Sequence, residues 1–296
     1  MLNFRIETFL AVCQTMNLTR AAQLLHITQP AVSQHIRALE EEYGAKLFVY
    51  QGKQLSLTEA GQLFLQTATT MRHDAHHLKE AIRDLSSHRR LDFGSTLTIG
   101  EYVMPQPLIR LLQQQPELHL RMIVSNTADL LRMLDQGQID FAIVEGFFAK
   151  QDYDSLPYRT ERYLPVCAPE HPCAQGSYSL EQLLDEHLLV REEGSGTREV
   201  LQRVLEERNL TLHDFSHCSE LGSLDTIKAL VTAGVGISFF YYPAVQKELA
   251  CGTLQEIQLD DCQITHDFTF LWRKGSVFGS YYREVFDLLQ PTDSSC

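Results

Sequence analysis

Residues 18–40, LTRAAQLLHITQPAVSQHIRALE, are the stretch that decides the fold of the N-terminal part of the chain. They predict two short helices joined by a tight turn at His26–Ile27. Thr19 and Thr28 are suitable N-caps for the two helices, and Pro30 lies in a first turn, where its missing N–H costs nothing. This order of cap, turn and proline predicts a helix-turn-helix, whose second helix enters the major groove of DNA.

The second helix has a polar face of the kind that reads base edges. Glutamine pairs with adenine through two hydrogen bonds, serine donates or accepts, and arginine suits guanine or phosphate. These exposed residues are Gln29, Ser33, Gln34 and Arg37. The segment that follows, LFVYQGKQLSLT, predicts a short hairpin turning at Gln51–Gly52. Lys53 at its tip would lie along the DNA backbone or in the minor groove. A small bundle that binds another protein is the alternative, but these features in this order favour DNA.

The net charge of −13 is unexpected for a protein that binds DNA, because affinity for the phosphate backbone normally depends on cationic side chains. The charge is unevenly distributed. Residues 1–94 hold 10 basic and 9 acidic side chains, a net charge of +1, whereas the remaining 202 residues hold 15 and 29, a net charge of −14. We therefore expect two units with separate roles, and we expect DNA affinity to come from several copies acting together.

A long helix is predicted to begin at Thr58–Glu59 and to pair with a second copy. Apolar residues recur along it at spacings of 4, 3, 4, 3, 4 and 3, the heptad pattern of paired helices: Phe64, Ala68, Met71, Ala75, Leu78, Ile82 and Leu85. A homodimer would place two reading helices on two half-sites. His73, His76 and His77 lie away from this seam and no third ligand is evident, so we expect a solvated face and no metal. Residues 86–90, SSHRR, read as an interdomain linker.

Beyond the linker, short apolar strands alternate with helices. LDFG (91–94), LHLRMIV (118–124) and FAIV (141–144) predict strands, and the segments between them predict helices. This alternation predicts a mainly parallel sheet covered on both faces, and YLPVCAP (163–169) a strand leading into a second lobe. Ligands bind such sheets at the carboxyl ends of the strands, between the lobes if there are two.

Two loops rich in hydroxyl groups follow strands in this acidic part. GSTLTIGEY (94–102) offers Ser95, Thr96 and Thr98, and EEGSGTRE (192–199) offers Ser195, Gly196, Thr197 and Arg198. Ser223 begins a third helix of this kind. Each feature alone is only an N-cap. Together they predict a small anionic ligand, an oxyanion or a carboxylate, because helix N-termini attract negative charge.

Other classes of function find little support. The chain shows no nucleophile–base–acid set, no P-loop lysine and no G-x-G-x-x-G fingerprint, so we expect no enzyme activity and no cofactor. Cys167/Cys173 and Cys251/Cys262 leave open a redox-sensing regulator as the alternative, although neither pair has an adjacent Lys or Arg. The N-terminus lacks the features of a secretory signal, and no apolar run is long enough to cross a membrane. We expect a cytoplasmic protein, associated with the nucleoid when bound to DNA.

Residues 9–64, FLAVCQTMNLTRAAQLLHITQPAVSQHIRALEEEYGAKLFVYQGKQLSLTEAGQLF, resemble the DNA-binding segment of the LysR-type bacterial transcriptional regulators. The resemblance implies a winged helix-turn-helix, a dimerising helix, a two-lobed effector domain like a periplasmic binding protein, and a homotetramer acting at promoters. It places Thr28, Gln29, Pro30, Ser33, Gln34 and Arg37 at the DNA, with Arg20 and Lys53 as supporting contacts. The family often has an arginine just after the Leu-Phe of the wing strand, where this chain has Tyr50 after LFV, and that position would lack a backbone contact.

In the second part, GSTLTIGEYVMP, IVEG and REEGSGTRE resemble the branch of the family that regulates sulfur or carbon assimilation. In that branch, the hydroxyl groups matching Thr96, Thr98, Ser195 and Thr197 contact the effector. The expected fold is thus α/β overall, with an all-α winged helix-turn-helix at 1–57, a linker helix and hinge at 58–90, and an effector domain at 91–296. Its lobe I would span about 91–163 and 265–296, and its lobe II about 164–264.

Overall fold

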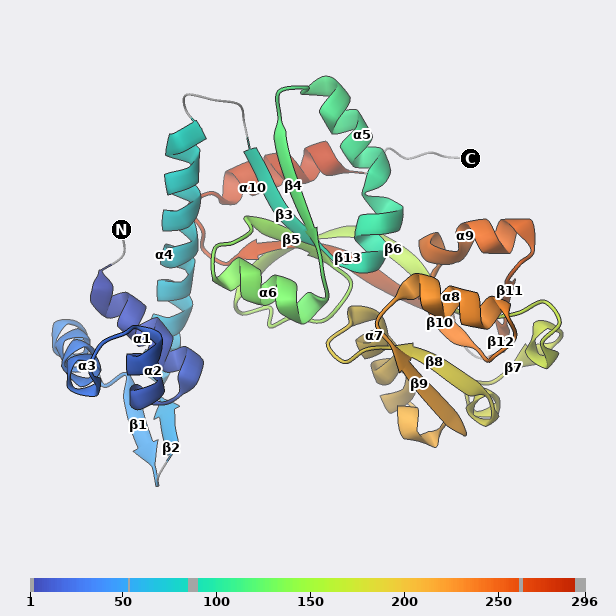
Figure 1. The fold of residues 1–296 in the computed structure, drawn as a ribbon, viewed down its shortest axis with the longest axis horizontal. Coiled ribbons are helices and arrows are strands. Elements are labelled where there is room, and N and C mark those ends of the chain that lie inside the picture. The colour runs from blue at the N-terminus through green and yellow to red at the C-terminus, as the bar shows by residue number, and fades with distance from the viewer. Residues whose placement is uncertain (1–2, 53, 85–89, 261–262, 291–296) are drawn as a thin grey trace.

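The computed structural model describes residues 3–52, 54–84, 90–260 and 263–290. A small helical unit with a hairpin lies at one end of the long helix α4, and a two-lobed α/β unit lies beside that helix (Figure 1). Within the described ranges, no helix is long and apolar enough to cross a membrane.

The N-terminal unit is a three-helix bundle followed by a two-stranded hairpin. Its elements are α1 (Phe4–Thr15), α2 (Leu18–Leu24), α3 (Gln29–Tyr43), β1 (Phe48–Gln51) and β2 (Gln54–Leu57). The hairpin turns at Gly52, whose φ of 64° is the left-handed region that glycine adopts freely. Phe9, Val32 and Leu39 are fully enclosed in its core. The predicted helix-turn-helix and hairpin are therefore both confirmed.

Two caps set the ends of the helix-turn-helix. Thr28 caps α3, and its hydroxyl accepts a hydrogen bond from the backbone N–H of Ala31 at 3.4 Å. The predicted cap at Thr19 is wrong, because the Asn17 side chain caps α2, accepting from the N–H groups of Thr19 and Arg20 at 2.9 and 3.0 Å. Asn is at least as good an N-cap as Thr, and the helix begins at Leu18, two residues earlier than predicted.

Helix α4 (Glu59–Asp84) carries the predicted heptad seam. Phe64 and Ala68 pack against the N-terminal unit, whereas Met71, Leu78 and Ile82 are 48%, 50% and 57% exposed. Leu85 and most of the predicted linker lie outside the described residues. Arg90, which the sequence assigned to the linker, instead begins strand β3 (Arg90–Ser95).

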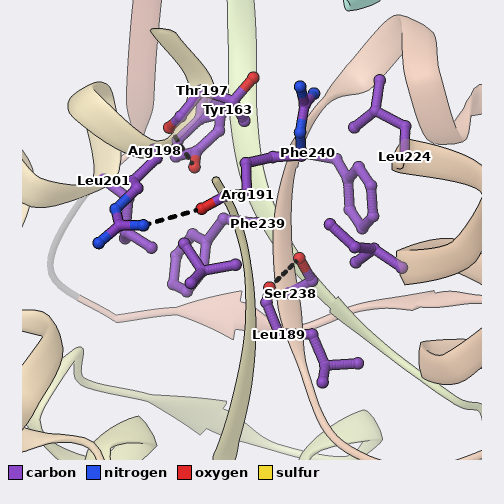
Figure 2. Close-up of a pocket in the computed structure, with 12 residues that line it drawn as sticks. Tyr163, Leu189, Arg191, Thr197, Arg198, Leu201, Leu224, Ser238, Phe239 and Phe240 are labelled. Atoms are coloured by element: carbon purple, nitrogen blue, oxygen red, sulfur yellow. Dashed lines mark hydrogen bonds between the residues drawn. The ribbon is translucent and has the colours of Figure 1, made fainter. Parts of the chain in front are cut away.

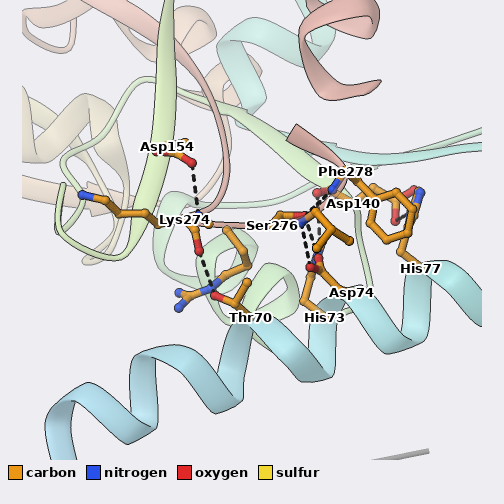
Figure 3. A network of polar contacts seen from close by, with 12 residues as sticks. Thr70, His73, Asp74, His77, Asp140, Asp154, Lys274, Ser276 and Phe278 are labelled. Carbon is orange, nitrogen blue, oxygen red and sulfur yellow. Dashed lines mark hydrogen bonds and ion pairs between the residues drawn. The ribbon is translucent and has the colours of Figure 1, made fainter. Parts of the chain in front are cut away.

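A polar network joins α4 to the α/β unit (Figure 3). Asp74 accepts hydrogen bonds from the Ser276 hydroxyl at 2.6 Å and the Val277 backbone N–H at 3.0 Å. His77 Nδ1 lies 2.7 Å from a carboxylate oxygen of Asp140. Although burial raises the pKa of Asp74, hydrogen bonds from His73, Ser276 and Val277 bring the net pKa below its ordinary value. The helix is thus held against the second unit by groups far apart in sequence.

The prediction that the three histidines of α4 face solvent is therefore wrong for two of them. His73 is 1% exposed, with Nε2 lying 3.2 Å from the Asp140 carbonyl oxygen, and His77 packs against the Phe278 ring at 4.2 Å between centroids. Only His76 is exposed. The face opposite the seam is occupied because it contacts lobe I, which the heptad pattern alone does not show.

Three strands of lobe I run parallel to one another. They are β3, β4 (His119–Val124) and β5 (Phe141–Val144), and the helices around them are α5 (Pro105–Gln114), α6 (Thr127–Asp135) and α10 (Gly279–Leu289). The π-helical turn Ile99–Val103 precedes α5. Four more strands belong to the same sheet: β6 (Tyr153–Cys167), β10 (Ser238–Tyr241), β11 (Gln255–Glu256) and β13 (Ile264–Arg273). The whole sheet has the order β10-β6-β13-β5-β3-β4, with β11 also pairing with β6.

The sheet is mixed rather than mainly parallel, because β13 (Ile264–Arg273), β6 (Tyr153–Cys167) and β10 (Ser238–Tyr241) all pair antiparallel. The strand predicted to begin at Tyr163 begins ten residues earlier, at Tyr153. It pairs with β13 in lobe I and continues to β10 in lobe II, so the two lobes share a sheet (Figure 1).

Lobe II packs helices around the parallel pair β8 (His187–Arg191) and β9 (His217–Leu221). The helices are α7 (Gly196–Glu206), α8 (Leu224–Thr232) and α9 (Tyr242–Cys251). Short strands β7 (Ser177–Tyr178), β11 (Gln255–Glu256) and β12 (Gln258–Leu259) and three 3₁₀ turns, Pro172–Ala174, Glu181–Asp185 and Leu212–Asp214, complete it. Helix α7, the first of these helices, begins close to the carboxyl ends of the lobe I strands, because Gly196 lies against Gly146.

Candidate functional site

The outer face of α3 presents the predicted base-reading residues to solvent. Gln29, Gln34 and Arg37 are exposed, and Ser33 is half-buried. Thr28 and Pro30 are also exposed at the start of the helix. The Gln29 amide donates to the Ser33 hydroxyl at 2.9 Å, so these two groups are held together on one side of the helix. The predicted set is thus on one surface, and Lys53 lies outside the described residues.

Two basic side chains of this unit are exposed and form no ion pair within the described residues. They are Arg20 on α2 and Arg37 on α3. Arg5 and Lys46, in contrast, pair with Glu42 and Glu40. Arg20 and Arg37 are thus the two of these four basic side chains that keep an unpaired charge.

The candidate effector site lies at the carboxyl ends of the parallel strands of lobe I. Ser95 ends β3 and Thr96 follows it, and Glu145 directly follows the neighbouring strand β5. The two strand ends are joined, since the Thr96 N–H donates to the Ile143 carbonyl at 3.2 Å. Parallel neighbours end at one edge of a sheet, so the topology brings these polar side chains together.

Glu145 is the residue that the site prediction missed. It is 1% exposed, and its Oε1 accepts a hydrogen bond from the Thr197 hydroxyl of α7 at 2.6 Å. Burial raises the pKa of this carboxyl above its ordinary value, against opposing effects of the Thr197 hydrogen bond, the Arg191 charge and the Thr98 and Thr96 hydroxyls. A buried carboxylate thus joins the two lobes. The only sequence signal for it was an acidic residue directly after a fully apolar strand.

Several polar atoms on Glu145 and at the strand ends of both lobes are buried and unpaired. Ser95 Oγ, Thr96 Oγ1, Glu145 Oε2 and one terminal nitrogen of Arg191 make no hydrogen bond within the described part of the chain. Buried polar groups are normally satisfied, because each unpaired one costs roughly 1–3 kcal/mol. A bound polar molecule could form the hydrogen bonds that these donors and this acceptor lack.

A small cavity lies within lobe II, close to the first turn of α7. Its volume is about 10 Å³, and Arg191, Thr197, Ser238 and the Tyr163 ring are among its lining residues, whereas Ser95, Thr96 and Glu145 are not (Figure 2). That volume admits about one water molecule. The two lobes touch at Gly146 and Gly196, where a β-carbon added at Gly196 would lie 2.5 Å from the Gly146 nitrogen.

The structure thus brings together most, but not all, of the predicted effector residues. Ser95, Thr96, Thr98, Ser195, Gly196 and Thr197 are all buried. Arg198 turns away to donate to the Arg191 carbonyl at 3.2 Å and to pair with Glu220. Ser223 is exposed and its hydroxyl caps α8, accepting from the Thr226 N–H at 3.3 Å. These last two residues already have structural partners.

One further group of ligand-type side chains lies in lobe II. His171, Cys173 and Glu186 offer ligand atoms within 4.8 Å of one another. They are hydrogen-bonded as they stand, since the Cys173 thiol donates to Glu186 at 3.2 Å and His171 Nδ1 accepts from the Cys173 N–H at 3.2 Å. Burial, followed by the adjacent Glu186, raises the pKa of the Cys173 thiol to about 12. A metal would have to replace these hydrogen bonds.

The same geometry bears on the redox alternative. Burial and Glu186 also raise the pKa of Cys167 to about 11. The thiolate is the reactive form of cysteine, so a raised pKa makes both side chains poor sensors at neutral pH. Cys262 of the second pair lies outside the described residues. The redox reading is therefore not favoured.

Comparisons with known proteins agree on one family. Residues 4–62 match the profile described as bacterial regulatory helix-turn-helix protein, lysR family, and residues 86–293 match the LysR substrate binding domain. The chain belongs to the LysR family of transcriptional regulators. The resemblance of residues 9–64 to that family is thereby confirmed. The family consists of transcriptional regulators rather than enzymes.

Relatives and solved structures cover nearly the whole chain. The HTH-type transcriptional regulator YeiE of Escherichia coli K12 is 30% identical over 86% of this chain and 85% of its own length. The RuBisCO operon transcriptional regulator of Allochromatium vinosum is 28% identical over 92% and 89%. Full-length BenM superposes with a TM-score of 0.59 at 21% identity, covering 98% and 95%. The regulatory domain of Synechocystis CcmR in complex with 2-PG gives 0.61 at 24%, covering 68% and 96%. The fold of both units is thus that of solved LysR regulators.

Proposed function

We propose that this LysR regulator reads operator DNA with α3 and responds to a small anionic effector bound between the two lobes. The observation that carries the effector part is the group of buried, unpaired polar atoms around Thr96 and Glu145. They lie where strand ends of lobe I face the first turn of α7, whose free N–H groups favour negative charge. The CcmR regulatory domain was solved with a small molecule, 2-PG, which supports a ligand in this kind of domain.

The effector part is tested by screening carboxylates and oxyanions for thermal stabilisation of the full-length protein, because a ligand that binds only the folded state raises its apparent stability. We expect Thr96→Ala and Ser195→Ala to weaken binding of any ligand found at least tenfold. Thr226→Ala, an exposed threonine on α8, serves as the control and should bind like the wild type. Unchanged affinity in both site variants would refute a site between the lobes.

The DNA part is tested by gel shift with the region upstream of the protein's own gene. Gln29→Ala and Arg37→Ala should each cost about 1–3 kcal/mol, or roughly 5- to 150-fold in affinity, if they contact bases. Arg132→Ala on the exposed face of α6 is the control and should change nothing. If the wild type did not bind this DNA and the two α3 variants behaved as it does, the assignment of α3 to DNA reading would lose its support.

We further propose that the protein acts as a homodimer through α4, assembled into a homotetramer, in the cytoplasm at promoter DNA. The exposed seam residues Met71, Leu78 and Ile82 support pairing of this helix with a second copy. An apolar groove of about 290 Å³ beside the seam, lined by Leu63, Phe64 and neighbouring residues, would accept the partner's helix. Two or four weakly charged reading heads would then supply the affinity that one lacks.

A further inference from the structure

The side chain of Glu145 limits what kind of anion the site between the lobes can accept. It is an acidic group with 1% exposure, in the middle of hydroxyl groups that would otherwise suit any oxyanion. The ionised form of Glu145 would repel a second full negative charge placed beside it, and repulsion is strong where water is excluded. Two acidic groups in one such site are tolerated when they share a proton.

The hydrogen-bonding capacity of the cluster indicates where that proton lies. Thr197 donates its only hydroxyl proton to Glu145 Oε1, and Oε2 has no hydrogen-bond partner among the described residues. Thr96 holds an unused hydroxyl proton, and Arg191 an unused N–H. The site therefore offers several donors and one acceptor. Its complement is a molecule with several acceptor oxygens and one hydroxyl.

We propose that Glu145 makes the site select oxyanions that retain a hydroxyl proton over isosteric oxyanions that have none. This inference rests on the proposed effector site and specifies its ligand class. The retained proton would point to Glu145 Oε2, while the other oxygens would accept from Thr96 and Arg191. An anion without a proton leaves Oε2 unpaired and adds a repulsive charge, so it is rejected on two counts.

Two isosteric pairs test the selectivity in the full-length protein. Phosphate and sulfate are both tetrahedral, but only phosphate keeps a hydroxyl at pH 7. Hydrogencarbonate and nitrate are the planar pair. We expect at least one proton-bearing member to bind, measured by titration calorimetry and thermal shift, and to bind at least tenfold more tightly than its partner. A site built to hydrogen-bond a ligand proton discriminates strongly against analogues without it.

Two variants connect the preference to this side chain. Glu145→Gln places an amide donor at the site without charge, so the preference should fall below threefold or reverse. Glu145→Asp keeps the acidic acceptor and should retain the wild-type order. Thermal melts of both variants without ligand check that they fold.

The outcomes separate this inference from the function on which it rests. Equal affinity within the pairs, a preference for sulfate or nitrate, or no binding of any of the four anions overturns the selectivity. So does an unchanged preference in Glu145→Gln, which would leave the side chain as a purely structural link between the lobes. The proposed effector site itself fails only if the broader screen finds no ligand sensitive to Thr96→Ala or Ser195→Ala.

Discussion

A single added methyl group at Gly196 should force the two lobes apart. Gly196 is the first residue of α7, and its β-carbon would lie 2.5 Å from the nitrogen and 2.7 Å from the α-carbon of Gly146. It would also lie 2.9 Å from the Cγ of Glu145. The first two atoms belong to the backbone, so rotating a side chain relieves neither contact. The strand end in lobe I or the helix in lobe II has to move.

The magnitude follows from the costs of overpacking. Forcing an extra carbon into a closely packed interior costs about 1–3 kcal/mol. Within a helix the same substitution normally stabilises, by about 0.5–1 kcal/mol, so the sign at this position is itself diagnostic. For a unit of this size, 1 kcal/mol corresponds to about 2–4 °C in melting temperature. We therefore expect Gly196→Ala to melt about 2–12 °C below the wild type.

The assay is thermal unfolding followed by circular dichroism, with Gly222→Ala as the matched control. A β-carbon at Gly222 meets nothing closer than a Glu192 carboxylate oxygen at 3.8 Å, an ordinary contact. That variant should melt at or slightly above the wild-type temperature. If Gly196→Ala melts within about 1 °C of Gly222→Ala, the close contact between the lobes does not constrain the protein and the reasoning is refuted.

Three further outcomes are expected. Asp74→Asn places an amide donor against the Ser276 hydroxyl or a backbone N–H, so urea unfolding should show a loss of about 1–3 kcal/mol, and exposed Asp185→Asn none. Because the folded pKa of Asp74 lies below its ordinary 3.8, its contribution is complete above that pH and disappears as the pH falls through the folded value. The wild type and Asp74→Asn should thus converge in urea midpoint between pH 4 and strong acid, and a constant gap would contradict this. Leu78→Asp should halve the mass of the assembly measured by light scattering and should abolish operator binding. The exposed change Lys79→Asp, which lies off the seam, should do neither. Tight operator binding by Leu78→Asp monomers would argue against pairing through the seam.

The helix-turn-helix was predictable because its determinants are local. The cap at Thr28, the proline in the first turn of α3 and the glycine turn of the hairpin each act within a few residues, and all are found as expected. The misplaced cap at Thr19 shows the precision of such reasoning, since Asn17 caps the helix two residues earlier, through the N–H groups of Thr19 and Arg20. The exposed seam of α4 was likewise readable, because helical periodicity is a property of the sequence.

The sequence by itself determined which segments become helices and strands, and that hydroxyl-rich turns follow the strands of both lobes. Only the tertiary structure decided which of those turns meet. It brought Glu145 to within 2.6 Å of Thr197, 52 residues away, and turned Arg198 to Glu220 instead. It also buried His73 against lobe I. Caps and periodicity depend on neighbours along the chain, whereas burial and the pairing of charges depend on distant segments that come together only when the sheet and the lobes have formed.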